Sequence, residues 1–262
     1  MAFPFTFWIL LAVSLVLCAL GFIKFVYFLS VGFGAAIAGQ SIALAVTAYL
    51  NGSRDICYLA FCALIAAYGI RLALFLVLRE HGDKNYRESQ STQSSKPITV
   101  LVRIFVWISL GILYVLQMTP MLYRGAEKAP SDIFLYIGIA LSACGLIIQI
   151  IADAQKSASK RANPDLPVMT GIYRISRFPG YFGDILVWTG VFVSGIPVYS
   201  GWQWVISTIG YVLALSIIIG NVKRLERRQN KTYRSLAAYK EYASGTPILL
   251  PLIPVYHLVK KS

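Results

Sequence analysis

Residues 58–77 read YLAFCALIAAYGIRLALFLV, a run of twenty positions in which Arg71 is the only charged residue. An α-helix rises about 1.5 Å per residue, so a run of this length crosses the roughly 30 Å hydrocarbon core of a bilayer. The segment therefore predicts a transmembrane helix, whose full extent we place at 57–78.

Six more apolar blocks of comparable length occupy residues 5–22, 25–49, 100–119, 133–151, 181–197 and 203–220. Of the 262 residues, 57% are hydrophobic and 13% are charged, whereas soluble domains carry about 25% charged residues. The sequence predicts an all-α, polytopic membrane protein with seven transmembrane helices in a single integral membrane domain, 1–262. Its membrane would be the inner membrane in a bacterium or the endoplasmic reticulum in a eukaryote.

The Lys and Arg residues lie mostly on one side of the predicted spans. With the N-terminus outside, about twenty of them fall on the inner side, and only Arg54, Arg124 and Lys128 fall on the outer side. This predicts an outside N-terminus and a cytoplasmic C-terminus. This topology also accounts for most of the net charge of +13. Nucleic-acid binding is not needed to explain the charge, and no basic run is interleaved with stacking aromatic residues.

The four cysteines lie inside or at the edge of apolar blocks and lack the CxxC spacing of a metal or redox site; they are Cys18, Cys57, Cys62 and Cys144. Only two histidines could join them. We therefore expect small buried hydrophobic side chains and no metal site.

The inner basic residues concentrate in two segments, 153–177 and 223–240, which flank the last two predicted spans. Clustered cations at an inner face would hold a phosphate-bearing ligand. The long inner connection at 152–180 contains Pro164, Pro167, Gly171 and Pro179, which indicates an ordered segment. We expect the working site to open on this side.

Arg71 lies in the middle of its predicted span, where an arginine costs about 2.5–3.5 kcal/mol on insertion scales. It should therefore face a protein cavity or a partner. Tyr68 stands three residues earlier, on nearly the same helical face, which suggests a ligand site inside the bundle. The alternative is a structural arginine bonded to backbone carbonyls. Gln40 is the only long polar side chain in the interior of its own span.

A polar stripe continues the apolar helix predicted at 133–151. Gln149, Asp153, Lys156 and Lys160 follow one another at spacings of four, three and four, which places them on one helical face. A helix end that snorkels into the headgroups, with Asp153 paired to Lys156, is the alternative. It would explain the lysines but not the deeper Gln149 and Asp153.

Residues 176–188, SRFPGYFGDILVW, open the next span with polar and glycine residues. Pro179 suits the first position of a helix, and Gly180 and Gly183 would let a backbone or a ligand approach closely. An anion at this helix N-terminus would meet the positive end of the dipole together with Arg177, while Asp184 could accept hydrogen bonds from ribose hydroxyls.

These segments together resemble the steroid 5α-reductase family, and most closely its bacterial branch of unknown function. The resemblance covers about residues 60–254. It rests on the segments YGIRLALFLVLREHGDKNYRE (68–88), DAQKSASKR (153–161), SRFPGYFGDILVW (176–188), LERR (225–228) and YKEYASGTPILLP (239–251).

The resemblance implies an NADPH-dependent reductase of a C=C bond conjugated to a carbonyl, in a steroid or another apolar enone lipid. Residues 1–56 would form the substrate side and 57–254 the reductase region. Tyr68, with Gln40 as second candidate, would bind the substrate carbonyl. The implied cofactor-binding residues are Arg71, Asp153, Lys156, Lys160, Arg177, Tyr181, Asp184, Arg224 and Tyr233, which we expect to converge on one chamber.

The chain departs from the family pattern at three places. Phe178-Pro179-Gly180 stands where the family usually has His-Pro-Asn, so an expected cofactor-binding amide is missing. Asn85 replaces an arginine in the Asp-x-Arg-Tyr motif. The spacing from Gln40 to Tyr68 is also shorter than the family pattern implies. These departures bear on the nicotinamide contacts and the substrate class.

Two other functions fit parts of the sequence. The isoprenylcysteine carboxyl methyltransferases share an Arg-x-Pro-x-Tyr-x-Gly motif and use S-adenosylmethionine. They favour two consecutive glutamates in the last helix, whereas Glu226 here precedes Arg227 and Arg228, which suit a phosphate-bearing cofactor better. A non-enzymatic lipid-binding membrane protein is the third possibility.

Overall fold

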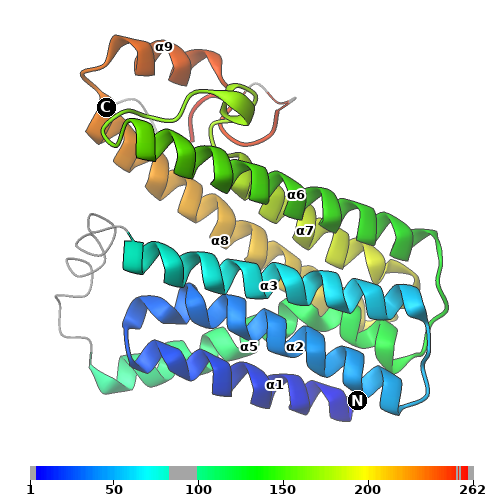
Figure 1. The fold of residues 1–262 in the computed structure, drawn as a ribbon. Coiled ribbons are helices and arrows are strands. Elements are labelled where there is room, and N and C mark those ends of the chain that lie inside the picture. The colour runs from blue at the N-terminus through cyan, green and yellow to red at the C-terminus, as the bar shows by residue number, and fades with distance from the viewer. Residues whose placement is uncertain (1–3, 83–98, 252, 254, 259–262) are drawn as a thin grey trace. The chain divides into compact units, whose positions relative to one another are not determined.

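The computed structural model describes residues 4–82, 99–251, 253 and 255–258, and their regular secondary structure is helical (Figure 1). The α-helices are α1 Phe5–Cys18, α2 Val31–Leu50, α3 Ile56–Gly82, α5 Val100–Ala126, α6 Ile133–Ala162, α7 Pro179–Ser194, α8 Trp202–Tyr233 and α9 Ala237–Gly245. Four 3-10 helices join them: η1 Ala19–Phe22, η2 Phe25–Leu29, η3 Gly171–Arg174 and η4 Ile196–Val198.

Seven helical segments of the described chain are long and apolar enough to cross a membrane, which confirms the predicted fold class. Three of them extend seven or more residues beyond their predicted spans: α5 continues to Ala126, α6 to Ala162 and α8 to Tyr233. Hydropathy marks where the lipid ends, but Ala, Lys, Arg and Gln are good helix formers, so α6 and α8 continue into the aqueous phase.

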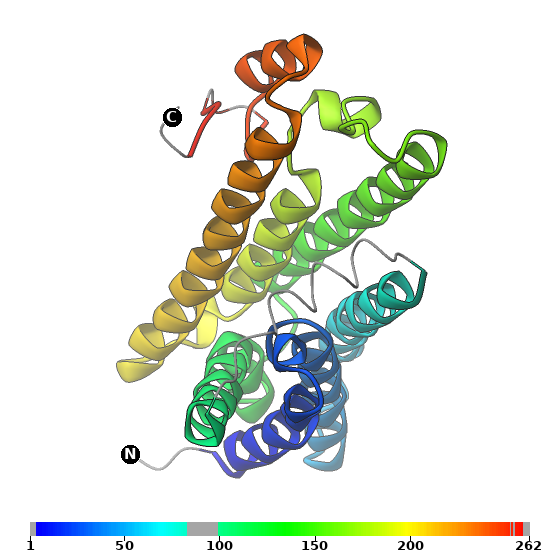
Figure 2. The ribbon, with the colours of Figure 1, turned by 90° about the vertical axis from the view of Figure 1, so that its left-hand side faces the viewer.

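The chain divides into two compact units, residues 1–139 with 191–211, and residues 140–190 with 212–262. In the first unit α1, α2, α3 and α5 pack as a bundle (Figure 2). Gly34 and Gly69 bring α2 and α3 into backbone contact, since a Cβ on Gly69 would lie 2.6 Å from the Gly34 carbonyl oxygen. This close crossing fixes the face of α3 that carries Tyr68.

Arg124, counted among the outer basic residues, is buried near the C-terminal end of α5 rather than solvated. Its guanidinium donates to the Ser194 carbonyl at 2.8 Å, to the Pro130 carbonyl, and to the Asp132 carboxylate at 2.7 Å. A cation that counts toward topology in the sequence therefore serves here to join α5 to the α5–α6 connection and to the end of α7.

In the second unit α6, α7 and α8 run side by side, with α9 near the ends of α6 and α8 (Figures 1 and 2). The C-terminal segment returns to the start of α7, where the Arg177 and Phe178 amides donate to the Pro247 and Ile248 carbonyls at 2.9 and 3.2 Å. Phe178, Val222, Ile248 and Leu249 form a buried apolar cluster at this end.

Candidate functional site

Tyr68 and Arg71 occupy the middle of α3 in the first unit. Tyr68 is buried, with 1% of its surface exposed, and Arg71 is half-buried with its guanidinium carbon 5.9 Å from the centroid of the Phe75 ring. The packing of neighbouring Gly69 against Gly34 holds Tyr68 within the bundle. A buried phenol next to a half-buried cation has the chemistry needed to stabilise negative charge on a ligand oxygen.

Gln40 of α2 is completely buried in the same unit. Its Nε2 donates to the Leu10 carbonyl at 3.4 Å, while its Oε1 has no hydrogen-bond partner. Polarising a substrate carbonyl requires a hydrogen-bond donor, and the Gln40 amide has one N–H besides the one that bonds Leu10. The prediction that Gln40 shares the role of Tyr68 at the substrate carbonyl stays a prediction.

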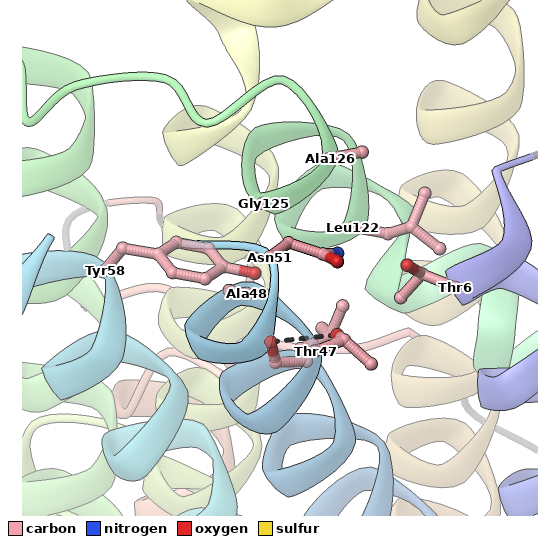
Figure 3. Close-up of a pocket in the computed structure, with 9 residues that line it drawn as sticks. Thr6, Thr47, Ala48, Asn51, Tyr58, Leu122, Gly125 and Ala126 are labelled. Carbon is pink, nitrogen blue, oxygen red and sulfur yellow. Dashed lines mark hydrogen bonds between the residues drawn. The ribbon is translucent and has the colours of Figure 1, made fainter. Parts of the chain in front are cut away.

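A small hollow of about 10 Å³ opens at another part of the first unit (Figure 3). Residues from α1, α2, α3 and α5, and Asn51 directly after α2, line it: Thr6, Leu44, Thr47, Ala48, Asn51, Tyr58, Leu122, Gly125 and Ala126. Ligand pockets usually measure roughly 300–1,000 Å³. Tyr58 also lies about 15 Å along α3 from Tyr68 by helical rise. This hollow is therefore not the predicted reductase site.

The polar stripe of α6 reaches both neighbouring helices of the second unit. Gln149 Nε2 donates to Asp184 Oδ1 of α7 at 2.8 Å, and Lys160 Nζ donates to the Tyr233 hydroxyl of α8 at 2.9 Å. Asp153 and Lys156 lie between these two bonds and are half-buried. Two pairs of residues that are far apart in the sequence, Gln149 with Asp184 and Lys160 with Tyr233, are thus in direct contact.

In the part of the chain that the structure describes, the Lys160 ammonium donates hydrogen bonds to three neutral oxygens. Besides the Tyr233 hydroxyl, its Nζ bonds the Pro164 carbonyl at 2.8 Å and the Leu166 carbonyl at 2.7 Å. No carboxylate neutralises the ammonium in these contacts. These three acceptors hold the ammonium in place and take up its three N–H donors, so a phosphate would interact with it mainly through its positive charge.

The connection between α6 and α7 is bonded to α6, in agreement with its expected order. Gln155 Oε1 accepts from the Ile172 amide at 2.9 Å, and the Tyr173 hydroxyl donates to the Ala152 carbonyl at 3.2 Å. Gly171 has a φ of +64° and lies against the Gln155 side chain, so a side chain here would be strained and would clash.

Pro179 is the first residue of α7, as predicted, but the two following glycines differ. A Cβ on Gly183 would lie 2.6 Å from the Gly145 carbonyl oxygen, so Gly183 permits α6 and α7 to touch. A Cβ on Gly180 would meet no atom within 4 Å. The packing of α7 against α6 therefore requires Gly183, while the space beside Gly180 is open.

Arg177 is buried, not held at the surface. Its Nη1 lies 3.5 Å from Glu226 Oε1 and 3.0 Å from the Tyr256 carbonyl, and its Nη2 lies 3.1 Å from the Tyr239 hydroxyl. These contacts give Arg177 a structural role in joining α7, α8, α9 and the C-terminal segment. The prediction that it binds cofactor stays a prediction.

Sequence reasoning did not identify Glu226 and Tyr239 as partners of Arg177. A signal was present for Glu226, because Val222, Glu226, Gln229 and Tyr233 recur at spacings of four, three and four on one face of α8. An acid on the same helical face as an apolar residue such as Val222 indicates a buried cation elsewhere. Nothing in the sequence identifies that cation as Arg177.

Two predicted residues remain to be placed, Tyr181 and Arg224. Tyr181 is half-buried and packs edge-on to Phe178, with ring centroids 6.3 Å apart. Arg224 is exposed and bonds Asn221 of its own helix at 3.4 Å. Asn85 lies outside the described residues. Among the residues that are described, no three His, Cys, Asp or Glu side chains gather as metal ligands.

A protein-family model described as "Protein of unknown function (DUF1295)" matches residues 31–246. The chain belongs to this family. The DUF1295 match runs from the first residue of α2 to just beyond α9, so it includes every predicted site residue and leaves out α1 and the last residues. Searches of curated proteins and of solved structures gave no match.

Proposed function

We propose that this DUF1295 membrane protein is an NADPH-dependent reductase of a C=C bond conjugated to a carbonyl in an apolar substrate. One observation supports it most directly. Residues that the reductase resemblance assigns to cofactor binding meet across helices of the second unit, with Lys160 bonded to Tyr233 and Asp184 bonded to the stripe residue Gln149.

The chemistry of these side chains fits a phosphorylated dinucleotide. The ammonium of Lys160 is held by neutral oxygens and keeps its charge for a phosphate, and Lys156 lies one turn away on the same face. Asp153 and Asp184 offer carboxylates to ribose hydroxyls or an amide. We propose that these four residues, with Tyr233, hold NADPH, which supplies the hydride when bound.

Tyr68 is the proposed donor to the substrate carbonyl. As hydride adds to the β-carbon, negative charge develops on the carbonyl oxygen, and the buried hydroxyl of Tyr68 would stabilise it. Arg71 would orient Tyr68 or neutralise nearby negative charge. Protonation of the α-carbon completes the reduction. The apolar surroundings of α3 suit a steroid or a simpler enone lipid that enters from the bilayer.

Ligand-induced stabilisation of the purified full chain in nanodiscs tests the proposal. A ligand at about 100 times its Kd stabilises the folded state by about 2.7 kcal/mol, so NADPH should raise the Tm. Stabilisation by S-adenosylmethionine instead would support the methyltransferase function, and stabilisation by neither would favour a lipid-binding protein. Consumption of NADPH is then screened with 3-oxo-4-ene steroids and simpler enones.

A further inference from the structure

The C-terminal part of α8 carries a stripe of basic side chains. Six Lys and Arg residues follow its apolar part, and all six are exposed: Lys223, Arg224, Arg227, Arg228, Lys231 and Arg234. At about 100° per residue they fall within an arc of roughly 140°. We call these six residues the basic stripe. They lie on one face of α8 and of the residue that follows it.

The one acidic residue within this stretch does not neutralise the basic stripe. Glu226 lies on the opposite face of α8 and has no exposed surface. Its carboxylate is occupied by Arg177, by His257 Nδ1 at 3.2 Å and by the Leu258 amide at 3.0 Å. In the sequence KRLERR the glutamate is adjacent to basic residues, but in the fold its carboxylate bonds interior groups and not the basic stripe.

The basic stripe continues a face of α8 that is suited to lipid. Leu213, Ile217 and Gly220 are exposed and precede Arg224 at helical spacings of four, three and four. They belong to the apolar part of α8, which is long enough to cross a membrane. An exposed apolar face of a helix long enough to cross a membrane is therefore followed, on the same face, by cations.

We infer that the basic stripe binds the anionic headgroups of the leaflet from which α8 emerges. Clusters of four to eight cations directly after a transmembrane helix attract acidic phospholipids, each contributing on the order of tenfold or less in affinity. Arginines among them bind phosphate oxygens through paired N–H groups. The continuity with the lipid-facing surface favours a lipid over a soluble acidic partner. This inference does not depend on the proposed reductase activity.

The test removes three charges from the basic stripe by Lys223→Gln, Arg227→Gln and Lys231→Gln in the full chain. Arg224 is left intact because it belongs to the predicted cofactor set. The matched control removes three exposed cations of the same unit, by Arg161→Gln, Arg174→Gln and Lys240→Gln. Native mass spectrometry of the detergent-solubilised proteins measures apparent Kd values for phosphatidylglycerol and phosphatidylcholine, with the Tm of each variant as a check of folding.

We expect the wild type and the control variant to prefer phosphatidylglycerol by about tenfold or more, and the stripe variant to lose most of that preference. Added salt should weaken the preference, because exposed charges are screened. Equal affinity of the wild type for the two lipids, or equal losses in both variants, would overturn the inference. The inference would also be overturned if the basic stripe were needed for binding polyglutamate and the wild type showed no preference for phosphatidylglycerol. That result would indicate a soluble acidic partner.

Discussion

Arg177 and Glu226 form an ion pair in which neither side chain has exposed surface, with Nη1 and Oε1 3.5 Å apart. The pair joins the residue before α7 to α8. The Tyr256 carbonyl and the Leu258 amide bring the C-terminal segment to the same two side chains. Two buried charges are costly to desolvate, so each is tolerated because the other is present.

Glu226→Ala should destabilise the protein strongly, because it leaves the Arg177 guanidinium buried without a counter-ion. Removing one partner of a buried pair costs about 3–5 kcal/mol, and thermal unfolding in nanodiscs would measure it. Glu241→Ala, at an exposed position of α9, is the matched control and should change the Tm little. Equal Tm shifts in the two variants would contradict a structural role for the pair.

Tyr68→Phe should lower turnover of a competent enone by about 10²–10³, because it removes the hydroxyl proposed to stabilise the developing oxyanion. NADPH binding, measured by thermal shift, should persist. Tyr136→Phe, which alters an exposed tyrosine of α6, serves as control. Unchanged turnover in the Tyr68 variant would remove this residue from the mechanism.

Lys160→Gln should weaken NADPH binding, since it deletes a positioned cation that donates hydrogen bonds to three neutral oxygens. Hydrogen bonds to charged groups contribute about 1.5–3 kcal/mol, so the Kd should rise by roughly tenfold to a hundredfold. Titration calorimetry in nanodiscs would measure it. The control is Arg161→Gln, which removes the exposed neighbouring cation. Identical Kd values in the two variants would contradict the assignment of Lys160.

Asp153→Ala should also weaken NADPH binding, because the proposed site loses a carboxylate that accepts from the cofactor. Thermal shift with NADPH would measure the loss as a smaller stabilisation at the same ligand concentration. An exposed acid of the same unit, Asp165, supplies the control variant Asp165→Ala. Full NADPH stabilisation of the Asp153 variant would exclude this residue from the cofactor site.

Gly183→Ala and Gly180→Ala should have opposite outcomes although the two positions are one helical turn apart. The added methyl at Gly183 meets the Gly145 carbonyl at 2.6 Å, and overpacking of this kind costs about 1–3 kcal/mol. At Gly180 the methyl meets nothing, and the higher helix propensity of alanine should leave the Tm equal or higher. A comparable loss of Tm at both positions would contradict the close α6–α7 crossing.

Sequence spacing identified several local features of the candidate site correctly. Pro179 begins α7, and the four-three-four spacing from Gln149 to Lys160 lies along one helix. These features depend on helical geometry within one segment, which the sequence encodes directly. The polar stripe of α6 bonds residues that are distant in the sequence: Asp184 lies 35 residues from Gln149, and Tyr233 lies 73 residues from Lys160. No local pattern specifies such a pairing.

The sequence by itself determined the membrane-spanning architecture, because the cost of placing a segment in lipid is set by that segment's own residues. The tertiary structure decided which charged side chains form hydrogen bonds and ion pairs with one another inside the protein. Arg177 and Glu226 belong to motifs that look solvent-exposed, yet they neutralise each other across 49 residues. The reason is that desolvation and charge pairing depend on neighbours brought close only by packing.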